Sequence, residues 1–370
     1  MNVVPRVSRR TLLLSTVTAV TVLAAVFIAA RRTEPHPSSA RMRTAAEHTV
    51  RCFEAVQVEK ERRGVTYDED AAHRRHPLLG TELSFLTTTL GSFEAKVAST
   101  NPEFAALAVR LLGEAGVDSG DAVGVTLSGS FPALGISLLC AVEQIGARPV
   151  IISSLGASTF GANEEAMTWA DMEGTLNRNN LLHVRSRLMT PGAEADTGGG
   201  LPEEGMEAIR KAVRRTGSVL IVPPDLPAAI ALRESLFLRE KISAYVNVGG
   251  SQAVLGTCPH APSYGNGILT PAAGCRDEGR GVIAAMLDRG VPVIHFLNIR
   301  DLARRYDIDE DGSNERPPSR LYEQQTVDPV WPLAGALLIA APLLWDRLRA
   351  RKDPHSPHLP TDKRMGTFSI

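Results

Sequence analysis

The chain has few cysteines, few aromatic residues and no excess of charge of either sign. Phe, Trp and Tyr make up 5% of its 370 residues, and the formal net charge is −1. A nearly neutral chain creates no overall field that attracts nucleic acid, and no basic run is interleaved with aromatic side chains. The four cysteines include no CxxC pair, which argues against a zinc or redox motif. We therefore predict no nucleic-acid partner, no metal and no cofactor.

The cysteines leave one question open. Cys258 and Cys275 flank a loop rich in Gly and Pro, and they would form a disulfide bond if the domain lay in an oxidising compartment. The alternative is a pair of free thiols. Cys140 lies in an apolar run, where we expect a small buried side chain.

Established catalytic motifs are also missing. A nucleophile elbow requires G-x-S-x-G, but Thr126 stands where the first Gly should precede Ser128. The chain has no Walker A motif and no GxGxxG after its first expected strand. The sequence therefore does not decide whether the protein is an enzyme.

What the sequence does have is an apolar run near each end. Residues 11–30 carry no charge and are long enough to cross a bilayer, with Arg9 and Arg10 before them. Ser8 to Leu13 also resembles a twin-arginine export signal, which is the alternative to an uncleaved anchor. Residues 330–345 have Trp331 and Trp345 at their edges, as in a second, short span, and basic residues follow them.

Two spans would place both termini on the same side of the membrane. The basic flanks favour cytoplasmic termini and a domain outside the cytoplasm, by a small margin. The expected order is a basic tail (1–10), a transmembrane helix (11–30), a linker (31–46), a domain (47–305), a linker (306–329), a second transmembrane helix (330–345) and a basic tail (346–370). We predict a location at the cell membrane.

Strand and helix patterns alternate through the domain. Short apolar runs predict strands at 121–127, 149–153, 218–222, 243–248 and 291–297. Helical patterns lie at 133–145, 169–177, 202–215, 227–241 and 280–289, after a charged helix from Glu47 to Arg63. This alternation predicts an α/β fold, with a largely parallel sheet covered by helices on both faces.

Three Gly/Ser loops follow expected strands. Parallel sheets bind ligands at the carboxyl ends of their strands, so we expect these loops to converge and to contact a ligand through amides and hydroxyls. Helix caps and tight turns are the alternative explanations of the same residues. The candidate ligand-binding residues are Ser128, Gly129, Ser130, Ser153, Ser154, Gly156, Ser158, Asn163, Asn247, Gly249, Gly250 and Ser251.

Four further side chains are possible acids or bases. Asp171 and Glu173 follow the second loop, but side chains two apart on a helix point to different faces. Asp225 follows a strand. His295 lies within an apolar strand, where a lone histidine is more often a hydrogen-bonded core residue.

At these loops the chain resembles the poly-gamma-glutamate system protein family. The similarity is carried by Val123 to Asn163 (VGVTLSGSFPALGISLLCAVEQIGARPVIISSLGASTFGAN), Thr168 to Glu173 (TWADME) and Ala244 to Gly256 (AYVNVGGSQAVLG), and it extends to the apolar run at each end. The resemblance implies a two-anchor accessory protein of bacterial poly-γ-glutamate synthesis and export. Its partners would be the membrane and the synthase and export proteins of the capsule polymer. The resemblance also implies that the protein contacts the polymer itself. The resemblance implies no catalytic residues.

Two other functions remain open. Val123 to Ala147 also looks like part of a phosphosugar-binding fold of the sugar-isomerase type, in which hydroxyl loops hold a phosphate. One βαβ unit is a generic feature, so this likeness needs a Glu or His base aimed into the loops. The other function is a non-catalytic scaffold between synthase and exporter, which would need no Glu or His base.

Overall fold

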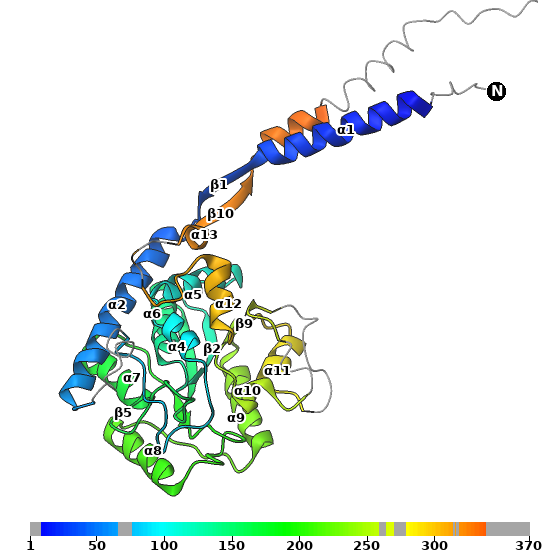
Figure 1. Ribbon diagram of the computed structural model, residues 1–370. Coiled ribbons are helices and arrows are strands. Elements are labelled where there is room, and N and C mark those ends of the chain that lie inside the picture. Colours follow the sequence, from blue (N-terminus) through cyan, green and yellow to red (C-terminus); the bar gives the residue numbers. More distant parts are fainter. Residues whose placement is uncertain are drawn as a thin grey trace, which may run out of the picture. The chain divides into compact units, whose positions relative to one another are not determined.

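Six strands form the sheet at the centre of the larger part of the chain (Figure 1). The computed structural model describes residues 9–65, 76–258, 264–269, 279–313, 315 and 318–337. In spatial order the strands are β6 (Leu188–Thr190), β3 (Arg148–Ser154), β2 (Ala122–Ser128), β7 (Ala244–Val248), β9 (Val293–Phe296) and β8 (Gly267–Ile268). All neighbours are parallel except β8, which runs antiparallel to β9. The expected α/β fold with a largely parallel sheet is confirmed.

Helices cover both faces of this sheet because strand residues alternate between two cores. Val123, Val125 and Leu127 belong to one core and Val150 and Ile152 to the other. The first core is shared by α2 (Ser39–Arg62), α4 (Phe93–Ser99), α5 (Glu103–Glu114), α6 (Pro132–Ile145), α7 (Trp169–Arg178), α8 (Glu203–Thr216), α12 (Ile299–Tyr306) and α13 (Ser319–Tyr322). The second is shared by α9 (Leu226–Glu240), α10 (Gln252–Leu255) and α11 (Val282–Asp288).

The strand order contains a topological switch point. From β2 the chain moves outward to β3 and β6, then returns to place β7 and β9 on the other side of β2. Leu127 of β2 is in register with Ser153 of β3 and Val248 of β7, so these strands end at the same edge. The helix after β2 (α6) lies on one face of the sheet and the helix after β7 (α10) on the other. The crevice between two such loops is the usual ligand site of doubly wound sheets.

The chain divides into two units, Pro35–Glu323 and a smaller one that combines Met1–Glu34 with Gln324–Ile370. In the smaller unit, α1 (Arg9–Ala30) leads into β1 (Arg31–Pro35), which pairs with β10 (Glu323–Val327). No helix in the described part of the chain combines the length and the apolarity that a membrane span requires. The transmembrane prediction for 11–30 is therefore not supported, and the one for 330–345 lies mostly outside the described residues.

Two local expectations differ from the structure. The helix α2 begins at Ser39, so it includes residues that were expected to form a linker. Residues 218–222 form no strand: only Leu220 makes a bridge, to Met189 of the short edge strand β6. Val219 and Val222 are about half exposed, because no described residue covers them beyond this edge. The two-residue strands β4 (Asn163–Glu164) and β5 (Met167–Thr168) form a separate pair.

The cysteines fall into two groups. Cys258 is disulfide-bonded, and its expected partner Cys275 lies outside the described residues. Cys52 of α2 and Cys140 of α6 are free and buried, with sulfur atoms 3.7 Å apart. The expectation that Cys140 is a small buried side chain is confirmed.

Candidate functional site

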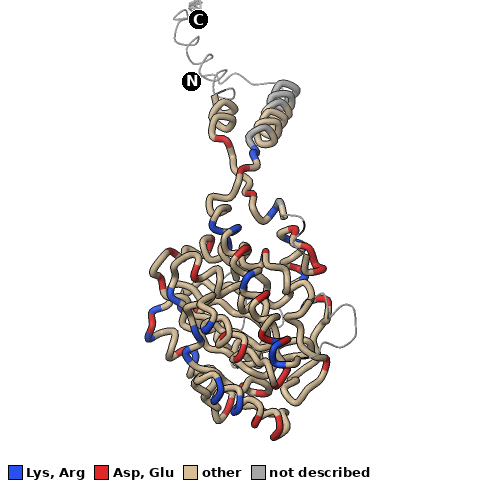
Figure 2. Tube along the Cα trace, turned by 90° about the vertical axis from the view of Figure 1, so that its left-hand side faces the viewer, with Lys and Arg blue, Asp and Glu red and all other residues tan. Residues whose placement is uncertain are grey.

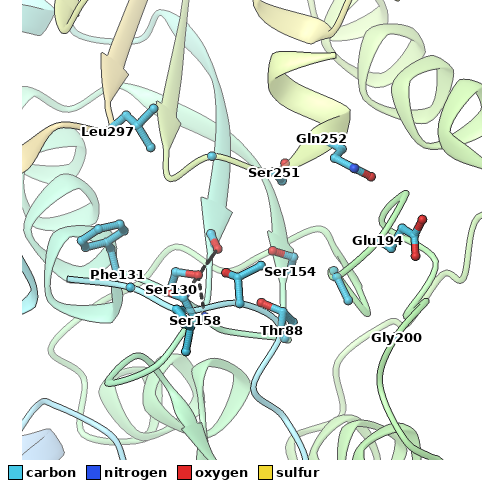
Figure 3. A pocket seen from close by; sticks show the side chains of 18 of the residues that line it. Thr88, Ser130, Phe131, Ser154, Ser158, Glu194, Gly200, Ser251, Gln252 and Leu297 are labelled. Atoms are coloured by element: carbon cyan, nitrogen blue, oxygen red, sulfur yellow. Dashed lines mark hydrogen bonds between the residues drawn. The ribbon is translucent and has the colours of Figure 1, made fainter. Parts of the chain in front are cut away.

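A pocket of about 460 Å³ opens at the carboxyl edge of the sheet (Figure 3). Residues that follow all five parallel strands contribute to it, together with the segment before α4. Its lining comprises Thr88, Thr89, Leu90, Gly91, Ser92, Lys96, Ser128, Ser130, Phe131, Ser154, Gly156, Ser158, Gly192, Ala193, Glu194, Gly199, Gly200, Gly250, Ser251, Gln252 and Leu297. The predicted convergence of the three Gly/Ser loops is thus confirmed, whereas their contact with a ligand stays a prediction.

The loop after β2 supplies two hydroxyls. Ser130 Oγ accepts hydrogen bonds from Ser128 Oγ at 3.0 Å and from the amide of Ser158 at 2.9 Å. The proton of the Ser130 hydroxyl is therefore left to donate to another group. Gly129 does not line the pocket: its amide donates to Ser154 O, and an added Cβ would lie 3.0 Å from Leu155 O. This glycine allows the loops after β2 and β3 to lie close together.

Some candidate residues of the loop after β3 line the pocket, and others hold the surrounding structure in place. Ser154, Gly156 and Ser158 line the pocket. Ser153 instead faces the core, where its hydroxyl accepts from Trp169 Nε1 and pairs with Ser186. Asn163 donates to Thr81 O and Thr87 Oγ1 and so holds the segment that precedes α4.

The loop after β7 is divided in the same way. Gly250 and Ser251 line the pocket. Asn247 is buried, and its amide donates to Gly249 O at 2.6 Å and to His295 Nδ1 at 2.9 Å. Gly249 has a φ of +101°, and an added Cβ would lie 2.8 Å from Ser128 Cβ. A residue with a side chain would therefore push the loops after β2 and β7 apart.

Asp171 and Glu173 are structural and do not line the pocket. Asp171 completes a capping box with Thr168 at the start of α7 and binds the guanidinium groups of Arg63 and Arg215. Burial alone would raise the pKa of Asp171, but hydrogen bonds from Arg215, Thr168 and Arg63 outweigh it and lower the pKa. Burial raises the pKa of Glu173 to about 7, although Ser186 donates two hydrogen bonds to it.

Neither Asp225 nor His295 lies among the lining residues. Asp225 caps α9, because its carboxylate accepts from the amide of Ala228 at 2.8 Å. His295 is fully buried in β9, and this burial lowers its pKa to about 4. Its Nδ1 accepts from Asn247, so it is a core histidine that supports the loop after β7.

Sequence reasoning missed Lys96, which is the one basic residue among the described lining residues of the pocket. Its side chain on α4 is 1% exposed, and Nζ donates to Ser158 Oγ at 2.7 Å and to Ser130 O. The ammonium also lies 4.1 Å from the centre of the Phe131 ring. Within the described residues no carboxylate forms an ion pair with it, and burial lowers its pKa to about 7. A lysine on a short helix gives no sequence signal, because such residues are usually exposed.

The segment before α4 is a second contribution that the sequence did not reveal. It runs beside the loop after β3, where Thr88 N donates to Ala157 O and Thr159 N donates to Thr89 O. Gly156 leaves the space that this approach needs, since an added Cβ would lie 2.7 Å from Thr88 Cγ2. The pocket therefore gains a wall from a part of the chain that lies outside the sheet.

The loop after β6 forms another wall of the pocket. Ala193, Ala195 and Asp196 adopt left-handed backbone conformations with φ of 61°, 55° and 65°. Such conformations cost about 1–2 kcal/mol each for residues with a side chain. Arg233 holds the last of these residues, since its Nη1 lies 2.7 Å from the Asp196 carboxylate and neither side chain is exposed. Strained loops of this kind concentrate at functional sites.

One group of potential metal ligands lies apart from the pocket. Within the described residues, the donor atoms of His48, Cys52 and Cys140 lie within 4.8 Å of one another. The hydrogen bond between the two thiols and their burial raise the pKa of Cys52. The thiolate form that binds metals is therefore disfavoured, and we interpret the group as packed thiols.

Charges give no further indication of a ligand, since Lys and Arg are interspersed with Asp and Glu along the larger unit (Figure 2). Comparison of the chain with models of known protein families, with curated proteins and with solved structures gave no match.

Proposed function

We propose that the protein is an accessory component of bacterial poly-γ-glutamate synthesis and export, and that its pocket binds the polymer or an anionic precursor. The observation that carries the binding proposal is Lys96, a buried cation that lines the pocket without a carboxylate partner in the described residues. Burying a charge is costly unless it is paired, so this site favours a ligand that brings negative charge.

The surroundings of Lys96 suit a carboxylate. Ser158 places its hydroxyl 2.7 Å from Lys96 Nζ, and Ser130 and Ser154 add further hydroxyls to the pocket lining. The glycines of the lining leave room for an extended chain. Hydrogen bonds to charged groups stabilise by about 1.5–3 kcal/mol, roughly twice the value for neutral pairs. The resemblance to the poly-gamma-glutamate system family then favours γ-linked glutamate among the possible anions.

A phosphosugar is the second candidate, because Glu194 lines the pocket. A carboxylate base aimed at the hydroxyl loops is the feature that a sugar-isomerase-type enzyme needs. Glu194 is exposed and belongs to the strained loop after β6. The two candidates differ in the ligand that should bind, so one titration series separates them.

The experiment measures binding to the full-length protein by calorimetry, with poly-γ-glutamate, fructose 6-phosphate and inorganic phosphate as separate ligands. We expect binding of the polymer, and at least a tenfold loss of affinity in Lys96→Met. Lys211→Met is the matched control, since Lys211 is exposed on α8. Binding of fructose 6-phosphate without the polymer would support the second candidate. A loss of secreted polymer on gene deletion, without any binding, would leave only a scaffold role.

The location at the cell membrane, with the domain outside the cytoplasm, stays a prediction. Alkaline phosphatase fused after Ser313 should be active, and a fluorescent protein fused there should not fluoresce. The opposite result would reverse the orientation, and recovery of a shortened soluble chain would favour the twin-arginine signal.

A further inference from the structure

Ser158 differs from the other hydroxyls of the pocket in its partner. Its Oγ lies 2.7 Å from Lys96 Nζ, the only hydrogen bond in the described part of the pocket between a serine and an amine. Ser128 and Ser130 bond to each other and to backbone groups. A serine hydroxyl becomes a nucleophile only when a neighbouring group can remove its proton, and the structure offers Ser158 such a group.

The backbone holds Ser158 rigidly at this distance. Its amide donates to Ser130 Oγ at 2.9 Å, and its carbonyl accepts from the amide of Gly161 at 3.0 Å. Lys96 comes from α4, whose first turn is held by a cap in which Ser92 Oγ accepts from the amide of Ala95. Nucleophile and base therefore come from two elements that are each locked by their own hydrogen bonds.

Within the described residues, the groups that contact Lys96 Nζ are uncharged. They are the Ser130 carbonyl from the loop after β2, the Ser158 hydroxyl from the loop after β3 and the Phe131 ring at the start of α6. An exposed lysine is neutral in about one molecule in a thousand near pH 7.4. Burial lowers the pKa of Lys96 to about 7, so the amine and the ammonium are both well populated. The amine form can accept the Ser158 proton.

We propose that Ser158 and Lys96 are a nucleophile and its general base, and that the pocket hydrolyses an amide bond on the γ-carboxyl of glutamate. This inference rests on the proposed function for its substrate. The Oγ–Nζ hydrogen bond, the burial of Lys96 and the place of both side chains on the pocket wall carry the assignment of the pair.

The steps balance without a further reactant except water. Ser158 Oγ attacks the amide carbonyl carbon while its proton moves to the Lys96 amine. The carbon–nitrogen bond breaks as Lys96 returns that proton to the leaving amine, and an ester on Ser158 remains. Water then attacks the ester carbonyl, gives one proton to Lys96 and releases the γ-carboxylic acid, and Lys96 reprotonates Ser158. The free proton of the Ser130 hydroxyl is suited to donate to the carbonyl oxygen as negative charge develops there.

The test uses the full-length protein with two probes. A fluorophosphonate reports a nucleophilic serine through an increase in intact mass, mapped to a peptide, and γ-glutamyl p-nitroanilide reports hydrolysis through released p-nitroaniline. We expect labelling at Ser158 and release of p-nitroaniline, both abolished in Ser158→Ala. Ser235→Ala, an exposed hydroxyl on α9, is the control that should keep both.

Lys96→Arg separates the base from the charge, because arginine stays protonated. Polymer binding should persist in this variant, while labelling and hydrolysis fall about 100-fold or more, the usual contribution of a general base. In the unchanged protein the labelling rate should rise with pH around 7. Absence of labelling at Ser158, labelling that survives in Ser158→Ala, or full hydrolysis in Lys96→Arg would each overturn the proposal. Polymer binding without labelling would leave the proposed function intact, and labelling and hydrolysis without polymer binding would remove only that function.

Discussion

Asp196 and Arg233 form an ion pair of 2.7 Å in which neither side chain is exposed. The pair joins the strained loop after β6 to α9, and Thr190 donates a further hydrogen bond to Asp196. Removing one partner of a buried pair leaves the other charge without compensation. The geometry of this wall of the pocket therefore depends on a contact outside the pocket.

Replacing Arg233 by Met should lower the free energy of unfolding by about 3–5 kcal/mol, the usual effect of an uncompensated buried charge. Arg210→Met is the control, because Arg210 lies on the surface of α8, where ion pairs contribute about 0–1 kcal/mol. Urea denaturation followed by tryptophan fluorescence measures both variants. Similar midpoints for the two would show that the buried pair does not hold the loop.

Adjacent glycines after β7 should respond differently to substitution. Gly249→Ala places a side chain in a left-handed conformation and 2.8 Å from Ser128 Cβ, so we expect a loss of about 2 kcal/mol and weaker polymer binding. Gly250→Ala meets the flexible ends of two side chains, Leu297 at 3.1 Å and Leu255 at 3.6 Å, and should cost less than about 1 kcal/mol. Denaturation and calorimetry on both variants test this. Equal losses would contradict the role given to Gly249.

Part of the fold follows from local sequence. The strands β2, β3, β7 and β9 are short apolar runs bounded by turn residues, and each was predicted within a few residues of its position. The strand β6 was missed, whereas residues 218–222, which are more apolar, were predicted as a strand and are not one. The difference lies in pairing. Residues 188–190 form a strand because they pair with β3, whereas residues 218–222 lie beyond them and make only one bridge, to Met189.

The site shows the same limit. The Gly/Ser loops could be predicted because each follows a strand of a parallel sheet, and such ends meet at one edge. Lys96 could not, because its function depends on how α4 packs against loops that lie more than 30 residues away. The acid and base candidates were residues of suitable type, but they have structural partners outside the pocket. Asp171 pairs with two arginines, Asp225 caps a helix and His295 bonds to a core amide.

His295 should make stability depend on pH. Burial lowers its pKa from 6.5 to about 4, so the unfolded chain binds a proton at this residue before the folded chain does. Its contribution is complete above pH 6.5 and is lost progressively as the pH falls from 6.5 to 4, by roughly 3 kcal/mol in all. Glu173, whose pKa is raised to about 7, acts in the opposite direction over part of this range. The comparison must therefore be with His295→Gln: its unfolding free energy should fall less between pH 6.5 and 4, and parallel curves would contradict the assignment.

Asp171 and Glu173 lie two residues apart on α7 and should respond to neutralisation in opposite ways. Asp171 binds Arg63 and Arg215, and its pKa is lowered, so it is ionised at neutral pH. Asp171→Asn removes one ion pair from Arg215 and one from Arg63, although Arg63 keeps its pair with Glu59. We expect a loss of about 3 kcal/mol in the free energy of unfolding at pH 7. Glu173 titrates near pH 7 and accepts hydrogen bonds from Ser186, which an amide oxygen can also accept.

Glu173→Gln should therefore change the free energy of unfolding at pH 7 by less than about 1 kcal/mol, and it should remove the gain in stability that Glu173 gives as the pH falls from 7 to 4.5. The sign follows from the raised pKa, because the folded chain binds this proton before the unfolded chain does. Both variants should keep polymer binding and labelling at Ser158, since neither side chain lines the pocket. Loss of labelling at matched stability in either variant would return these carboxylates to the list of catalytic candidates.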